Sequence, residues 1–317
     1  MIGVAVALGA MATFNYAMGR RAERRNPPSG RFVQIEGVRL HYVERGEGPP
    51  VILLHGNGAM VEDFVISGVL DRLSRHHRVI AFDRPGFGHS DRPRDRVWSA
   101  AEQARLIRAA LRLLDVRQPI ILGHSWGTMV ALEMALARPD DTAGLALVSG
   151  YYFPTLRLDV PLLSPPAIPV VGDVLRYTIS PLLGWLLAPL IFRKLFGPAP
   201  VTRDFRSRFP LAMALRPWQI RASAGDTALM VPGAAALAGR YAELEIPVTI
   251  IGAPGDRIVD HEAQAGALHH TLPHSDLARI EDAGHMLHHT RPEAVVSAIT
   301  EMAAALGQRD ASPAASG

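Results

Sequence analysis

Cysteine is absent from the sequence, which excludes disulfide bonds and thiolate metal sites. A large excess of one charge is also missing, because the formal net charge is only +3 at pH 7 and the arginines are spread along the chain. No basic stripe is interleaved with aromatic side chains, as nucleic-acid binding would require. No histidine pair has the H-E-x-x-H spacing of a zinc site. These absences argue against a nucleic-acid partner and give no indication of a metal or an organic cofactor.

Charged side chains are missing from residues 2–18, an apolar stretch that is followed by Arg20, Arg21, Arg24 and Arg25. A cleaved signal peptide carries its positive charges before the apolar stretch, whereas here they follow it. If the stretch crosses a bilayer, the positive-inside tendency places the rest of the chain in the cytoplasm. Its length is at the lower limit for a span, so an interfacial or packed helix is the alternative. We therefore expect a membrane-anchored chain that faces the cytoplasm, or a cytoplasmic protein.

Short apolar runs alternate with helix-length segments along most of the chain. The runs are typical of strands buried on both faces, and they read "VILLHG", "RVIAFDRPG", "PIILGHS", "GLALVSG" and "PVTIIGAPGD". Helices are predicted at residues 61–75, 99–114 and 126–137. Ahead of them, "RFVQIEGVRLHYVERG" predicts a hairpin that turns at Glu36 and Gly37. This order predicts an α/β fold with a mainly parallel, doubly wound sheet, in which functional residues gather at the carboxyl ends of the strands.

Residues 151–224 break this alternation, because they contain no clear strand pattern and many prolines. A structureless loop of that length is improbable in a compact domain, so we predict a helical lid inserted after the sixth strand. The cluster "PLLGWLLAPLIF" could cross a membrane, but Pro181, Gly184 and Pro189 interrupt it and favour a buried or lid-forming helix pair. The predicted organisation is an apolar segment at residues 1–25, a core made of residues 26–150 and 225–306, the lid at residues 151–224, and a disordered tail at residues 307–317.

The motif Gly123-His124-Ser125-Trp126-Gly127 lies where an apolar run gives way to a helical pattern. It fits the G-x-S-x-G nucleophile elbow, in which a serine occupies a strained turn between a strand and a helix. Glycines are needed there because neighbouring backbone packs closely against the turn. A serine that only caps the following helix is the alternative. The strand before the motif and the helix after it favour the elbow, with Ser125 as nucleophile.

A serine nucleophile needs a base that takes its proton and a third group that holds the base. With this motif the chain order is serine, acid, histidine. Asp256 and His285 each follow a predicted strand. The other usual place for the acid, after the sixth strand, reads "SGYY" and has no carboxylate. We therefore predict Asp256 as the acid, in preference to Asp260.

The sequence contains 13 histidines, so the choice of base needs a reason. His285 is preferred to its neighbours His288 and His289 because Gly284 before it marks a sharp loop start. His124 adjoins the serine on a path from strand to turn, so its side chain is expected to point elsewhere. Surface positions are predicted for His76, His77, His269 and His270.

Acyl transfer also needs N–H donors at the place where the oxyanion forms. The backbone amide of Trp126, directly after the serine, is one candidate. The other is expected from the "HGNG" loop after the first apolar run, where the amide of Asn57 is preferred and that of Gly58 is the alternative. Glycine at Gly56 and Gly58 lets this backbone turn its N–H groups inward. An ordinary turn is the non-functional interpretation of the same loop.

Residues 32–306 resemble the α/β-hydrolase family, with Ser125, Asp256 and His285 matching its nucleophile, acid and base. "HGNG" is similar to its oxyanion loop, and "DRPGFGHSDRP" is similar to the loop that members carry after the next strand. Members that resemble epoxide hydrolases and haloalkane dehalogenases use aspartate where this chain has Ser125, which disfavours those activities. Asn57 stands where dehalogenase-like members place a halide-binding asparagine. Without the aspartate nucleophile we interpret Asn57 as part of the oxyanion loop.

The resemblance implies a serine hydrolase that cleaves a carboxylic ester or a related acyl compound through an acyl-enzyme on Ser125. Carbon–carbon bond hydrolases and cofactor-free haloperoxidases carry the same triad and remain alternatives. Two alternatives lie outside enzymes: a binding protein on a hydrolase scaffold, and a membrane-tethered interaction module. The apolar lid predicts a small hydrophobic acyl substrate. The resemblance implies no metal, no cofactor and no protein partner.

Overall fold

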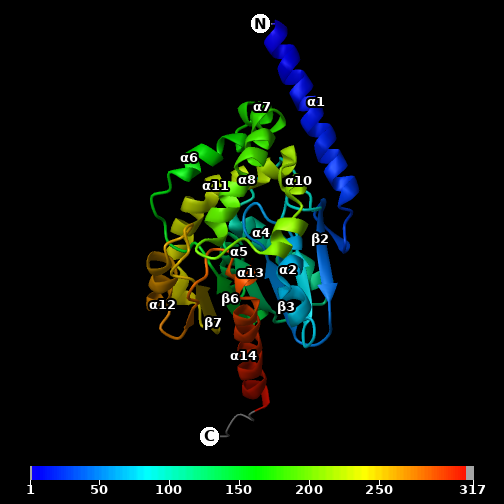
Figure 1. Ribbon diagram of the computed structural model, residues 1–317. Helices are drawn as coiled ribbons and strands as arrows, with labels where there is room; N and C mark the ends of the chain where they lie inside the picture. The colour runs from blue at the N-terminus through cyan, green and yellow to red at the C-terminus, as the bar shows by residue number, and fades with distance from the viewer. Residues whose placement is uncertain (1, 312–317) are drawn as a thin grey trace.

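An eight-stranded sheet organises the computed structural model, which describes residues 2–311 (Figure 1). The strands are β1 (Arg31–Ile35), β2 (Val38–Arg45), β3 (Pro50–Leu54), β4 (Arg78–Phe82), β5 (Ile120–His124), β6 (Gly144–Val148), β7 (Val248–Gly252) and β8 (Asp276–Arg279). Their order in the sheet is β1-β2-β4-β3-β5-β6-β7-β8. The pairs β1–β2 and β2–β4 are antiparallel, and the remaining pairs are parallel. The predicted mainly parallel sheet is confirmed, and the initial hairpin turns at Glu36 and Gly37, both with positive φ.

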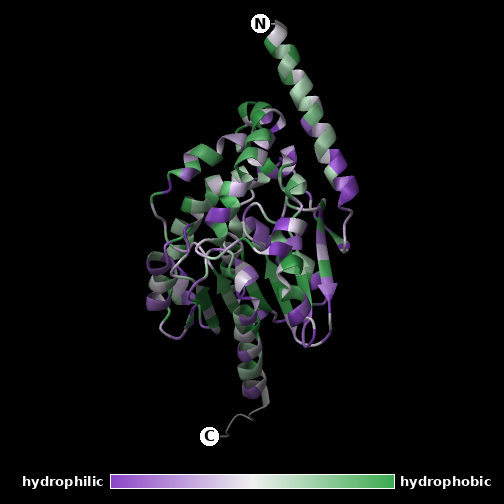
Figure 2. Ribbon diagram, viewed as in Figure 1, coloured by the Kyte–Doolittle hydropathy of each residue, from purple (hydrophilic) through white to green (hydrophobic). Residues whose placement is uncertain are grey.

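Helices cover both faces of the sheet, whose central strands are largely apolar and buried (Figure 2). In β3, Ile52 and Leu54 belong to one buried cluster, whereas Val51 and Leu53 belong to the other. The first cluster includes residues of α4 (Ala100–Leu113) and α5 (Gly127–Ala137). The second includes residues of α2 (Glu62–Ser67), α3 (Val69–Leu73) and α14 (Pro292–Ala311). The short helices α12 (Ala267–Thr271) and α13 (Leu287–Thr290) follow β7 and β8.

The predicted helices match the structure closely, with one break. α4 and α5 lie within one residue of the predicted bounds. The helix predicted at residues 61–75 is instead two helices, α2 and α3, divided at Gly68. Gly68 has φ of 75°, a left-handed conformation that ends α2 and that glycine adopts without strain.

A helical insertion follows β6, as the sequence predicts, and we refer to it as the cap. It contains α6 (Asp159–Leu163), α7 (Val171–Tyr177), α8 (Ile179–Phe196), α9 (Arg203–Arg208), α10 (Leu211–Ala214) and α11 (Pro217–Ala238). The expectation that Pro181, Gly184 and Pro189 divide the apolar cluster into a helix pair is wrong, because α8 is one continuous helix. Pro181 lies in the first turn, where its missing N–H costs nothing. α11 also continues past the predicted lid boundary at residue 224 into the core.

The two ends of the described chain are both helical. α1 (Ile2–Arg25) packs against the cap, where Asn15 Nδ2 donates to the carbonyl oxygens of Tyr177 and Thr178, each at 2.9 Å. Its first turns project from the body of the molecule (Figure 1). At the other end α14 continues to Ala311, so residues 307–311 are helical where a disordered tail was predicted. Residues 312–317 of that predicted tail lie outside the described residues.

Candidate active site

Ser125 lies in a strained turn between β5 and α5, with φ of 52°. A Cβ at Gly123 would lie 2.6 Å from Thr128 Cα, and a Cβ at Gly127 would overlap the carbonyl oxygen of Leu54. Both glycines of the motif are therefore required by the close backbone approach that the sequence predicts. The side chain of Ser125 does not cap α5, since no side-chain cap is formed there. Its hydroxyl is free to face another partner.

Three side chains from separate loops form one hydrogen-bonded line. Ser125 Oγ lies 2.9 Å from His285 Nε2, and His285 Nδ1 lies 2.8 Å from Asp256 Oδ2. Asp256 follows β7 and His285 follows β8, so the parallel sheet brings the loops together at its carboxyl edge. The structure thus gathers the three residues that the sequence singles out. Asp260 is exposed and instead accepts from the backbone N–H of Ala263.

The loop holding Asp256 fixes the carboxylate in place. Its Oδ1 accepts from the backbone N–H groups of Ile258 at 2.7 Å and Val259 at 3.2 Å. Oδ2 is left to pair with His285, and the side chains of both residues are nearly fully buried. In this geometry the imidazole carries its proton on Nδ1 and offers the Nε2 lone pair to Ser125.

The "HGNG" loop lies directly against the nucleophile. A Cβ at Gly56 would be only 3.1 Å from Ser125 Cβ, so glycine is needed for this approach. Among the hydrogen bonds of residues 2–311, none uses the backbone N–H of Asn57 or Trp126. Trp126 directly follows Ser125 in the chain, and Asn57 directly follows Gly56, which approaches Ser125. The two predicted oxyanion donors are thus next in the chain to the nucleophile and to its neighbour Gly56.

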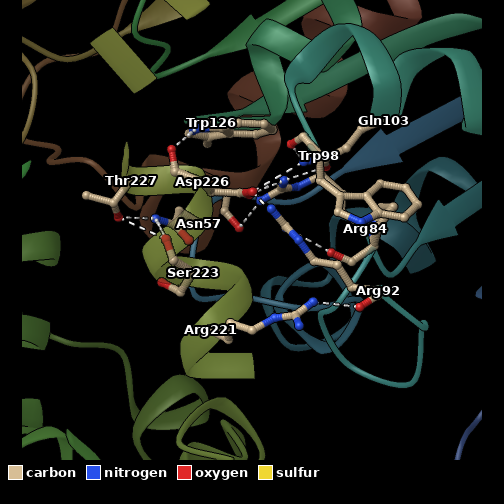
Figure 3. Close-up of polar contacts among 12 residues, drawn as sticks. Asn57, Arg84, Arg92, Trp98, Gln103, Trp126, Arg221, Ser223, Asp226 and Thr227 are labelled. Atoms are coloured by element: carbon tan, nitrogen blue, oxygen red, sulfur yellow. Dashed lines mark hydrogen bonds and ion pairs between the residues drawn. The ribbon is translucent and has the colours of Figure 1, made fainter. Parts of the chain in front are cut away.

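The side chain of Asn57 points toward Ser223 and Thr227 of the cap (Figure 3). Its Nδ2 donates to the carbonyl oxygen of Ser223 at 3.1 Å and to Thr227 Oγ1 at 2.9 Å, both on α11. Both amide hydrogens are used in these contacts. The side chain consequently acts as a tie between the loop and the cap, which agrees with its interpretation as loop structure.

A buried arginine orients the same loop (Figure 3). Arg84, which follows β4, donates through Nε to the carbonyl oxygen of His55 at 2.8 Å and through Nη2 to that of Gly56 at 3.1 Å. The Gly56 carbonyl and the Asn57 N–H belong to one planar peptide unit, so holding the oxygen also aims the hydrogen. Arg84 is completely buried and pairs with Asp226 on α11, Nη1 to Oδ2 at 2.7 Å.

The carboxylate of Asp226 is the centre of this network. Its other oxygen accepts from Arg92 Nη1 at 2.8 Å and from Gln103 Nε2 at 3.2 Å. The backbone carbonyl of Asp226 accepts from Trp126 Nε1 at 2.9 Å, and the Arg84 guanidinium lies over the Trp126 ring. One residue of the cap therefore contacts Trp126 directly and the oxyanion loop through Arg84. The sequence does not reveal the roles of Arg84 and Asp226, because the pair is 142 residues apart and no local motif marks Asp226.

His55, the first residue of the "HGNG" loop, contacts the same Gly56 carbonyl that Arg84 holds. Its Nε2 accepts from the backbone N–H of Arg84 at 3.0 Å, so its proton lies on Nδ1, which is 2.8 Å from the carbonyl oxygen of Gly56. Burial, and after it the charge of the neighbouring Arg84, lowers the pKa of His55 from 6.5 to about 4. His55 is thus neutral at neutral pH, in the one tautomer that this loop can use.

A cluster of histidines lies behind the base. His124 Nε2 is 3.0 Å from the carbonyl oxygen of His285, and its ring packs 4.2 Å from that of His288. His288 and His289 do not reach the serine but pair with Asp63, at 3.0 and 2.7 Å. Burial alone would raise the pKa of Asp63, but these two imidazoles hold it well below its usual range. Burial lowers the pKa of both His124 and His288.

This cluster supports the loop of the base from behind. Asp63, His124 and His288 place possible ligand atoms within 4.8 Å of one another, the only such group among the described residues. Both carboxylate oxygens of Asp63 are already used by imidazoles, so the arrangement is explained as a hydrogen-bonded support. His77, predicted at the surface, is buried, and that prediction is wrong. His77 lies directly before Arg78, where β4 begins.

The end of α8 packs on the loop that carries the base. The backbone N–H of Met286 donates to the carbonyl oxygen of Leu195 at 3.2 Å. A Cβ at Gly284 would overlap the carbonyl oxygens of Phe196 and Gly197, so only glycine fits before His285. The cap therefore contacts the base loop through α8 and the oxyanion loop through α11.

Comparisons with known proteins agree with the fold. The family model described as alpha/beta hydrolase fold matches residues 49–292. A 2-hydroxymuconate semialdehyde hydrolase from Pseudomonas putida is 36% identical over 138 residues, 42% of this chain and 48% of that protein. Haloalkane dehalogenase 2 from Mycobacterium tuberculosis is 30% identical over 128 residues, 40% of this chain and 44% of that protein. The aligned part thus spans about half the length of these curated relatives.

Solved structures resemble the chain over a greater length. An α/β hydrolase fold protein from Burkholderia ambifaria has a TM-score of 0.72 and 26% identity, and the match covers 86% of this chain and 97% of that chain.

Proposed function

Because the chain belongs to the α/β hydrolase fold family, we propose that it is a serine hydrolase that cleaves a carboxylic ester or a related acyl compound. The observation that carries the proposal is the continuous line from Ser125 Oγ through His285 to Asp256, with 2.9 and 2.8 Å between successive partners. These are the contacts that an activated serine needs.

The reaction has two stages. His285 Nε2 takes the hydroxyl proton as Ser125 Oγ attacks the acyl carbonyl carbon, and Asp256 stabilises the imidazolium that results. His285 then gives this proton to the departing alcohol oxygen, and the acyl group remains on Ser125. A water molecule, deprotonated by His285, attacks the acyl-enzyme and releases the carboxylic acid and the free serine.

The negative charge on the former carbonyl oxygen is stabilised by the backbone N–H groups of Asn57 and Trp126. Each such donor contributes about 100- to 1000-fold in rate because it is already in place when the charge develops. Arg84 and His55 hold the Gly56 carbonyl and thereby keep the Asn57 N–H directed at that position. No metal or organic cofactor enters this mechanism.

The nucleophile and Asn57 separate this proposal from other activities in the family. Relatives such as the haloalkane dehalogenase are similar over less than half of their length, and this chain carries serine at the elbow. Both hydrogens of the Asn57 amide are engaged by α11, which leaves no side-chain donor for a halide. A serine hydroxyl that is activated by a histidine base favours acyl transfer.

Carbon–carbon bond hydrolysis is the second candidate, because a relative named as a 2-hydroxymuconate semialdehyde hydrolase is 36% identical over 138 residues. The uncharged segments of the cap favour a hydrophobic substrate in either case. Steady-state hydrolysis of p-nitrophenyl esters of increasing chain length, beside turnover of 2-hydroxymuconate semialdehyde, distinguishes the two. Efficient ester turnover supports the proposal; turnover of the semialdehyde alone overturns it in favour of the second candidate.

Two matched variants test the assignment of the acid. Asp256→Asn is expected to lower kcat by about 10³- to 10⁴-fold, because the imidazole loses its orientation and its charge partner. Asp260→Asn alters a nearby exposed carboxylate that has no contact with His285 and should leave kcat unchanged. An equal effect of the two substitutions would contradict the assignment.

A further inference from the structure

The cap exposes an apolar surface that the proposed chemistry does not use. Residues 160–172 and 179–192 contain no charged side chain. Several large apolar side chains from these segments and their flanks are more than half exposed, namely Leu156 (90%), Leu158 (77%), Leu162 (75%), Val170 (75%), Leu186 (75%) and Leu190 (64%). We call this set the cap apex surface. Contiguous exposed apolar patches of this kind are rare on soluble monomers and mark contact surfaces.

α8 contributes Leu186 and Leu190 to the cap apex surface. Among the described residues it is the one helix that is both long and apolar enough to cross a bilayer, yet only 17% of it is buried. A core helix of that composition would be largely buried. Figure 2 shows apolar residues along α6, α7 and α8, at the end of the molecule from which α1 projects.

α1 is fixed to the same end of the cap. Asn15 is buried and donates to the carbonyl oxygens of Tyr177 and Thr178, directly before α8 begins. The Tyr16 ring meets the Trp218 ring edge-on, with 6.3 Å between centroids. Residues 2–14 therefore extend past the start of α8, and they are uncharged. An exposed apolar helix and the exposed apolar cap apex surface are thus held together as one unit.

The length of α1 limits what it can do alone. Its uncharged stretch, residues 2–18, is about 25 Å long at 1.5 Å per residue. The hydrocarbon core of a bilayer is about 30 Å thick. Residues 15–18 lie beside the cap, so the projecting part is shorter still. α1 can enter a bilayer from one side, and the end of the cap then meets the membrane surface.

The charges that follow the apolar parts of α1 and α8 indicate the partner, whereas residues 160–172 are bounded by Asp159 and Asp173, each paired with an arginine. Arg20, Arg21, Arg24 and Arg25 follow the apolar part of α1, and Arg193 and Lys194 follow that of α8. Apolar side chains at the tip with cations behind them match acyl chains covered by anionic headgroups. A second copy of this chain would oppose cations with cations.

We propose that the cap apex surface docks on a bilayer that contains anionic lipids, beside the inserted α1. The anionic headgroups of the cytoplasmic leaflet place the protein on that side of the membrane. The inference goes beyond the proposed hydrolysis, because bilayer binding requires no chemistry at Ser125. In this proposal one side of α8 faces lipid, and the end of α8 contacts the loop that carries His285, through Leu195 and Met286.

Flotation of the full chain with vesicles of phosphatidylcholine and phosphatidylglycerol tests the proposal. The triple variant Leu162→Ser, Leu186→Ser and Leu190→Ser removes apolar area from exposed positions, so its fold should persist. We expect it to lower the partition coefficient at least about tenfold. The control variant Val97→Ser and Leu113→Ser changes side chains that are 70% and 67% exposed on the core, and it should bind like the wild type.

Each other outcome overturns the proposal. If wild-type protein stays with the unbound fraction, or if the triple variant floats as the wild type does, the cap apex surface does not face lipid. If light scattering without vesicles shows a dimer that the triple variant abolishes, the surface binds a second copy. Ser125→Ala should float normally, which separates a failure of docking from a failure of the proposed hydrolysis.

Discussion

Arg84 and Asp226 form a completely buried ion pair that joins the cap to the core, with 2.7 Å between Nη1 and Oδ2. Arg84 also holds the carbonyl oxygen of Gly56, whose peptide unit supplies the N–H of Asn57. Asp226 lies on α11, next to the residues that hold the Asn57 side chain. The orientation of the Asn57 N–H, the proposed oxyanion donor, therefore depends on a contact with the cap.

Replacing Asp226 by asparagine should lower the free energy of unfolding by about 3 to 5 kcal/mol, because two arginines lose their buried counter-charge. Urea unfolding followed by circular dichroism measures the change. Asp71→Asn is the matched control, since it breaks an exposed pair with Arg45 and should cost less than about 1 kcal/mol. A similar loss of unfolding free energy in both variants would show that the burial of the Arg84–Asp226 pair does not determine its contribution to stability.

Arg84→Lys should lower kcat by about 10- to 100-fold on an ester substrate, with KM nearly unchanged. Lysine keeps the charge but cannot bind the carbonyls of His55 and Gly56 together with Asp226. The Asn57 N–H is then no longer held in one orientation. Arg92→Lys is the control, because Arg92 pairs with the same carboxylate but does not contact the oxyanion loop. Equal losses of kcat in both variants would argue for a purely structural role.

Stability should fall as the pH drops from about 6.5 toward 4. Burial, and then Arg84, lowers the pKa of His55 from its usual 6.5 to about 4. Below pH 6.5 the unfolded chain takes up a proton that folded His55 refuses, so this contribution is present at neutral pH and lost on acidification. For His55 alone the loss amounts to about 3 kcal/mol.

Other buried histidines act in the same direction. Burial lowers the pKa of His77, His89, His124, His261 and His288. Thermal unfolding between pH 7 and 4 measures the combined slope. His55→Gln should make that slope shallower, whatever it does to stability at pH 7; an unchanged slope would show that His55 does not titrate as described.

The sequence could predict those features that adjacent residues encode. Uniformly apolar runs ended by glycine mark the central strands, because strands buried on both faces need no polar alternation. Ser125 could be located because Gly123 and Gly127 are each required by a backbone approach that no Cβ would permit. Asp256 and His285 could be found by chain order and by their place after strands.

Features that depend on distant partners could not be predicted. Arg84 and Asp226 meet only because the cap folds back over the oxyanion loop, and nothing near either residue indicates it. The pairing of Asp63 with His288 and His289 joins positions 225 and 226 residues apart. The sequence pattern gave a wrong prediction at α8. Its prolines indicated a break, but the helix continues through Pro189, which lies on an exposed face.

The most direct test of the central claim is labelling of the full chain with a fluorophosphonate, followed by mass spectrometry of the modified peptide. We expect one adduct, on Ser125, that is absent in Ser125→Ala. In His285→Ala the rate of labelling should fall at least about 100-fold, because the serine then lacks its base. Ser207→Ala, at an exposed serine, should label as the wild type does. Labelling that persists in Ser125→Ala, or none at all in the folded wild-type protein, would contradict the assignment of Ser125 as an activated nucleophile.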